Sequence, residues 1–169
     1  MNRHKRLFVS PIKEEELIKN QTIKTISINA IVCAMYVALC VALNPINFGV
    51  LQFRVATLLL PLGFQDKRFA NGIILGVIIA NLTSSLGLID VCVGFTIQFT
   101  MYYLFPYFIK NKWIHGIAYA VLSGTLVALE LLSVLHIPFL YSFVTVGLSG
   151  LILYEVGNVL CARLLKYID

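Results

Sequence analysis

Six apolar runs, separated by short polar segments, make up the chain after its first 25 residues. They occupy residues 26–43, 55–64, 69–86, 89–109, 113–134 and 139–165. Of the 169 residues 59% are hydrophobic and 12% charged, whereas about a quarter are charged in a soluble domain. Because a membrane-spanning helix needs roughly 20 mainly apolar residues, the sequence predicts an all-α membrane protein with six transmembrane helices. The second run is short, so it either extends back through Gln52 or is a broken helix buried by its neighbours.

The basic residues are unevenly distributed among the segments that join these runs. Twelve of the 13 lie in the N-terminal tail, in QDKRF (65–69), in KNK (110–112) and in the C-terminal tail. Since Lys and Arg are enriched on cytoplasmic segments, both termini are predicted to be cytoplasmic. The net charge of +5 then reflects a face near anionic lipid and requires no nucleic acid. Residues 1–25 are predicted to form a cytoplasmic tail with a short surface helix after Ser10, and residues 26–169 a single membrane domain.

Arg54 is the one basic residue on the predicted outer side. A charge near bilayer depth is costly unless it is paired or hydrated, so Arg54 either lines an outward-facing pocket or snorkels to the headgroups. The pocket is favoured because other polar residues are predicted at the same depth. Asp90 and Glu130 are candidate partners for Arg54 or for a ligand cation, although Asp90 is also a possible N-cap of the fourth helix. The predicted substrate-binding residues are Phe48, Gln52, Arg54, Asn81, Asp90 and Glu130.

No catalytic motif accompanies these polar residues. The sequence contains no GxxxxGKS/T, HExxH or GxSxG pattern, so we expect no enzymatic activity, no cofactor and no metal. The four cysteines lie in apolar runs and are interpreted as small buried residues. Gln98 is interpreted as a partner in a helix–helix hydrogen bond. Glu155 and Asn158, one turn apart, are interpreted as structural residues that pair with each other or with Arg163.

A ladder of small residues runs along the first predicted helix, at Ala30, Ala34, Ala38 and Ala42. Residues four apart form one slowly drifting stripe on a helix. Small side chains at this spacing allow another helix to approach closely in lipid. The stripe is therefore either a docking face for a partner membrane protein or a site of packing against the chain's own helices.

Three stretches resemble the QueT family: NPINFGVLQFRV (44–55), LGVIIANLTSSLGLIDVCVG (75–94) and LELLSVLHIPF (129–139). Members of that family are S components, the substrate-binding membrane subunits of energy-coupling factor (ECF) transporters. The resemblance covers roughly residues 28–160, and the alanine ladder is similar to the docking motif of S components. It implies six spans, an external substrate pocket and a location in the bacterial cytoplasmic membrane. It also implies partners: one transmembrane coupling subunit, and two ATPase subunits that hydrolyse ATP.

The chain departs from the family pattern at two positions that bear on the substrate. Thr57 and Gly150 stand where QueT-like sequences have acids. The ligand usually assigned to the family is an aminomethyl-deazaguanine, a queuosine precursor, whose amine and guanine-like donors carboxylates would satisfy. Either Asp90 and Glu130 replace the two acids or the substrate differs, with cobalamin as the other candidate. The loss of two acids inclines the sequence away from the deazaguanine.

Two functions of other classes stay open. A stand-alone secondary transporter would be driven by an ion gradient, with Asp90 or Glu130 as the ion or proton site. The absence of evident inverted repeats argues against it. A structural membrane adaptor without a ligand would leave Arg54 unexplained.

Overall fold

The computed structural model describes residues 11–43 and 54–168, and within them every regular element is helical. The long helices are α1 (Pro11–Ala42), α4 (Ala70–Asn81), α5 (Leu88–Phe99), α6 (Lys112–Leu135) and α7 (Phe139–Ile168). Shorter elements join them, namely the 3₁₀-helix η1 (Val55–Leu59), α3 (Leu60–Gln65), the 3₁₀-helix η2 (Lys67–Phe69), the π-helix η3 (Thr100–Leu104) and the 3₁₀-helix η4 (Phe105–Tyr107).

Four segments of the described chain are long and apolar enough to cross a membrane: Lys19–Ala42, Leu88–Tyr107, Lys112–Leu135 and Phe139–Tyr167. These correspond to the first, fourth, fifth and sixth predicted spans, the first ending one residue and the fourth two residues before the predicted end. The second and third correspond to the short helical segments Val55–Gln65 and Lys67–Asn81. The prediction of an all-helical membrane protein is confirmed, while six complete spans and cytoplasmic termini stay predictions.

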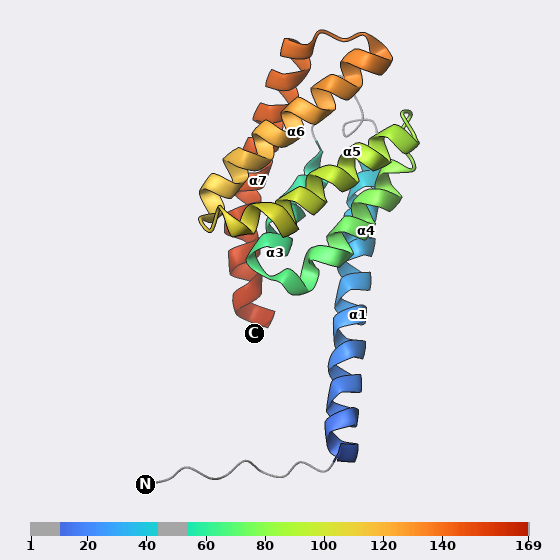
Figure 1. Ribbon diagram of the computed structural model, residues 1–169, viewed down its shortest axis with the longest axis vertical. Helices are drawn as coiled ribbons and strands as arrows, with labels where there is room; N and C mark the ends of the chain where they lie inside the picture. Colours follow the sequence, from blue (N-terminus) through green and yellow to red (C-terminus); the bar gives the residue numbers. More distant parts are fainter. Residues whose placement is uncertain (1–10, 44–53, 169) are drawn as a thin grey trace.

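The described chain runs alternately up and down the bundle (Figure 1). The turns at 82–87 and 136–138 lie at one end, and the start of α1 and the end of α7 lie toward the other. We call these the outer and inner ends, after the assignment that the basic residues favour. Pro61 lies in the first turn of α3, where a proline's missing N–H costs no helical bond.

The N-terminal helix is longer than the sequence predicted. The expected short surface helix and the first span form one continuous helix, α1, whose N-terminal part projects beyond the other helices (Figure 1). Asn29 marks where packing begins, because its side chain donates to the Arg68 carbonyl at 2.7 Å and accepts from the Gly72 N–H. The predicted division after residue 25 falls inside α1 and stays a prediction.

Two breaks near α5 set the shape of the outer and inner turns. α4 ends at Asn81, five residues before the predicted end, because Thr83 and Ser84 bond to nearby backbone in a tight turn. Gly87 closes that turn with φ of 59°, a conformation that favours glycine. At the other end of α5 the helix widens into η3 and then narrows into η4, which contains Pro106 and ends at Tyr107.

The inner half of the bundle is held by polar groups that bond to one another. Asn158 donates to the Lys112 carbonyl at 3.1 Å and to the Glu155 carboxylate at 2.8 Å, and it accepts from Gln65 at 3.1 Å. The expectation that Glu155 and Asn158 form a structural pair is confirmed.

A second buried link in this half joins α6 to α7 and to the π-helix. The fully buried His115 ring lies 2.8 Å from both the Tyr154 hydroxyl and the Met101 carbonyl. Of the four cysteines, Cys92 is exposed, which contradicts its predicted burial, while the other three are buried as expected.

Candidate functional site

A polar cavity lies between α1, η1, α4, α5, α6 and α7. Its polar lining consists of Tyr36, Arg54, Thr57, Asp90, Gln98, Tyr119, Ser123 and Ser149. The space open to the centres of water molecules is about 40 Å³, enough for roughly three waters. A ligand of nucleobase size must therefore displace lining side chains when it binds.

Arg54 is placed at this cavity by the elements that follow it in the chain. It immediately precedes η1, whose Leu58 carbonyl accepts a bond from the Cys161 thiol of α7 at 3.4 Å. The next element, α3, is fixed by the Tyr102 hydroxyl, which donates to the Leu60 carbonyl at 2.8 Å. Both contacts come from distant parts of the sequence and fix the backbone that carries the guanidinium.

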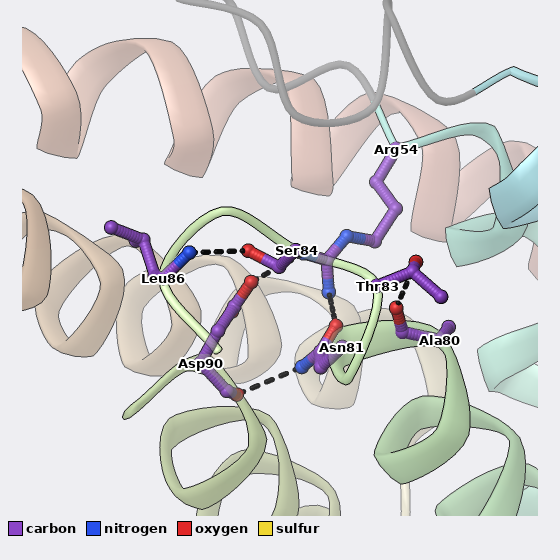
Figure 2. Close-up of polar contacts among 7 residues, drawn as sticks. All are labelled: Arg54, Ala80, Asn81, Thr83, Ser84, Leu86 and Asp90. Carbon is purple, nitrogen blue, oxygen red and sulfur yellow. Dashed lines mark hydrogen bonds and ion pairs between the residues drawn. The ribbon is translucent and has the colours of Figure 1, made fainter. Parts of the chain in front are cut away.

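The guanidinium joins two of the predicted site residues (Figure 2). Arg54 Nη1 donates to Asn81 Oδ1 at 3.1 Å, and Nη2 lies 3.8 Å from Asp90 Oδ2. Asn81 in turn donates from Nδ2 to the Asp90 backbone carbonyl at 2.8 Å. The Arg54 side chain is 21% exposed and that of Asp90 is 9% exposed. The Arg54 guanidinium points into the protein rather than away from it. The structure therefore does not show the snorkelling alternative.

Asp90 is not the N-cap of its helix. That position belongs to Gly87, and Asp90 lies in the first turn of α5. There its negative charge is favourably placed relative to the helix dipole. Close packing of α4 and α5 is possible because of Gly94, where a Cβ would collide with the Asn81 amide and with Val77.

Glu130 is buried just beyond the cavity. Its residue is 4% exposed, and neither carboxylate oxygen has a hydrogen-bond partner among the described residues. On α6 it continues the face formed by Tyr119, Ser123 and Val127, which line the cavity. Ser142 stands similarly one turn before the lining residue Val146 on α7, and its hydroxyl also lacks a partner within the described chain.

The structure thus brings Arg54, Asn81 and Asp90 together and places Glu130 on a neighbouring helix face. Phe48 and Gln52, also predicted for the site, lie outside the described residues. Both positions where the chain lacks a family-like acid, Thr57 and Gly150, belong to the cavity wall.

The sequence analysis missed the tyrosines and serines of the lining. Tyr119 and Ser123 lie one turn apart on α6, and both line the cavity together with Thr57 of η1. The spacing of 119, 123 and 127 before Glu130 was a usable signal, because it marks one helix face. The contribution of Tyr36 from α1 had no comparable signal.

The predicted docking residues lie on the exposed part of α1, at a groove between α1 and α4. Ala30, Ala34, Ala38 and Ala42 are all exposed, and the first three line a groove that Leu75 and Ile79 of α4 complete. Packing against the chain's described helices therefore does not account for the ladder.

These features define a multi-pass membrane protein with apolar spans and a small polar cavity between its helices. The family model of the QueT transporter matches residues 26–166. The chain therefore belongs to the QueT transporter family, as its resemblance to that family predicted, and it is a transport protein rather than an enzyme. Neither the curated proteins nor the solved structures include a match to this chain.

Proposed function

We propose that the chain is the substrate-binding S component of an ECF transporter, and that its cavity takes up a queuosine precursor of the aminomethyl-deazaguanine type. The observation that carries the first part is the exposed alanine ladder of α1 with its groove against α4. A transporter subunit without a nucleotide-binding motif draws its energy either from an ion gradient or from an ATPase on another chain. Close helix approach over small residues is a suitable way to attach to it.

The cavity supports the substrate class. A compact space lined by hydroxyls, an amide and an ion pair suits a small planar nitrogen heterocycle better than a ligand of corrinoid size. Asp90 and the buried Glu130 are available to accept hydrogen bonds from its amine and ring donors. Cobalamin is the second candidate, since Thr57 and Gly150 make the wall less acidic than the family pattern implies.

The docking proposal is tested by adding bulk to the ladder. We expect Ala34→Trp and Ala38→Trp to abolish co-purification with an ECF coupling subunit and its two ATPases, and to abolish uptake, because the helices can no longer approach closely. Binding of the deazaguanine to the isolated subunit should be unchanged. Val121→Trp, at an exposed position on α6, is the matched control.

Two results would contradict the proposal. Equal complex formation by the parent and the ladder variants would remove the docking face. Uptake that persists without the ATPases but collapses with an uncoupler would identify an ion-driven transporter instead. Titration of the purified parent with aminomethyl-deazaguanine and with cobalamin, combined with mass spectrometry of co-purified small molecules, distinguishes the two substrates.

A further inference from the structure

Gln98 presents a buried polar atom for which the described chain offers no partner. It lies on α5, is 4% exposed and lines the cavity. Its Oε1 accepts no hydrogen bond from any described residue. The helix–helix hydrogen bond that the sequence predicted for this acceptor is therefore not formed. Because buried acceptors in native proteins are almost always satisfied, such an atom in a cavity wall is a candidate for contact with a ligand.

The surroundings of Gln98 differ from those of the ion pair. Asp90 lies eight residues earlier on the same face of α5, about 12 Å away along the helix axis. The other uncharged polar lining residues all carry hydroxyls, namely Tyr36, Thr57, Tyr119, Ser123 and Ser149. We call the wall at Arg54 and Asp90 the charged end of the cavity, and the wall at Gln98, where α5 adds no further charged lining residue, the neutral end.

We propose that Gln98 determines specificity by pairing with an amide or lactam edge of a planar ligand. This inference rests on the proposed function and adds which part of the substrate the neutral end recognises. A carboxamide presents one acceptor and one donor side by side. It therefore matches a ring edge that carries an N–H beside a carbonyl, as an amide side chain matches a nucleobase edge. The charged end then takes the ligand's cationic or anionic substituent.

The main test is a thermodynamic cycle of binding affinities that combines one substitution in the protein with one change in the ligand. Gln98→Met keeps length and apolar volume but removes the amide. The probes are aminomethyl-deazaguanine and its N1-methylated analogue, in which the lactam N–H is replaced. We expect methylation to weaken binding to the parent at least tenfold and binding to Gln98→Met less than twofold. Equal losses in both proteins would overturn the inference.

A second measurement does not depend on the ligand. If Gln98 serves recognition, removing its unsatisfied acceptor leaves the melting temperature of the purified, unliganded protein unchanged or raised. Gln21→Met, at an exposed position of α1, is the matched control. A melting temperature for Gln98→Met clearly below the parent's and the control's would indicate a structural role and overturn the inference.

Failure of the substrate assignment is distinguishable from failure of this inference. If the parent binds no deazaguanine, the assignment is wrong, and mass spectrometry then identifies what the parent carries through purification. An amide-bearing molecule that the parent retains and Gln98→Met loses supports the role of Gln98. A molecule retained equally by both proteins contradicts it.

Discussion

Both ends of the bundle contain buried polar side chains, but these side chains are hydrogen-bonded at the inner end and partly unbonded toward the outer end. At the inner end, Asn158 bonds to Gln65, to Glu155 and to the Lys112 carbonyl, and His115 has a partner on each ring nitrogen. In the cavity and outward of it, Gln98, Glu130 and Ser142 keep polar atoms without partners among the described residues. Satisfied networks fix one packing arrangement, whereas each buried unpaired group costs about 1–3 kcal/mol.

This difference indicates that the inner end serves stability and that the cavity and the outer end serve ligand binding. The inner network links α3, α6 and α7 and stabilises the bundle. The unpaired groups lower stability, and the protein retains them where a ligand with complementary donors can satisfy them. The Arg54–Asn81–Asp90 contacts are intermediate, because they are bonded but include an ion pair of 3.8 Å that a ligand can rearrange.

The largest effect is expected from breaking the inner network. Asn158→Leu removes the side-chain bonds to Gln65 and to the Lys112 carbonyl and leaves the Glu155 carboxylate without its amide donor, while the bond from Gln65 to the backbone carbonyl of residue 158 stays. We expect a loss of about 3 kcal/mol in the free energy of unfolding, measured by denaturation in detergent. Asn20→Leu, at an exposed position of α1, is the control. If Asn158→Leu proved as stable as this control, the inner end would not be the stabilising region.

A smaller and different effect is expected at the ion pair. Arg54→Lys keeps the charge beside Asp90 but cannot also bond Asn81 through a planar fork. We expect binding of aminomethyl-deazaguanine to weaken by about tenfold, or about 1.4 kcal/mol, with a far smaller change in melting temperature than for Asn158→Leu. Arg163→Lys, exposed at the inner end, is the control. Unchanged affinity would mean that Arg54 shapes neither the cavity nor its ligand.

The sequence could predict those features that depend on local composition, such as where helices form and where a charge needs a partner. The apolar runs determine where helices form, and the predicted segments match the described ones closely from α5 onward. The position of Arg54, alone among outer segments, predicted that polar partners gather around it, because an unpaired charge at that depth is costly. Its partner Asn81 was found for the same reason, as a polar residue at the same depth.

Other features depend on tertiary packing that no local pattern encodes. The hydrogen bond predicted for Gln98 is not found at its Oε1 within the described chain, because sequence cannot show whether a neighbouring helix supplies a donor. Tyr36 reaches the cavity only because α1 packs on α4, and the end of α4 at Asn81 depends on side-chain bonds within a turn. Continuity of α1 through residue 25 was missed because the change from polar to apolar composition does not interrupt helical bonding.

The smallest effect should come from a polar pair that belongs to neither group. Asp66, between α3 and η2, accepts from the Arg68 backbone at 2.9 Å and from its Nε at 2.7 Å. Partial burial alone would raise the pKa of Asp66, but the bonds and charge of Arg68 outweigh it and lower that pKa. Because the folded pKa of Asp66 lies below the unfolded one, the pair stabilises the protein at pH values above the unfolded pKa, about 3.9. This contribution is lost as the pH falls through the folded pKa.

Since Arg68 is exposed, we expect Asp66→Asn to cost less than about 1 kcal/mol at pH 7. The difference from the parent should be the same at pH 7 and pH 5 and should shrink as the pH falls below about 4, measured by melting in detergent at pH 7, 5 and 3 with Glu16→Gln as the exposed control. A difference that is the same at all three values would show that the carboxylate's charge contributes nothing, and that Asp66 acts only as the cap of η2.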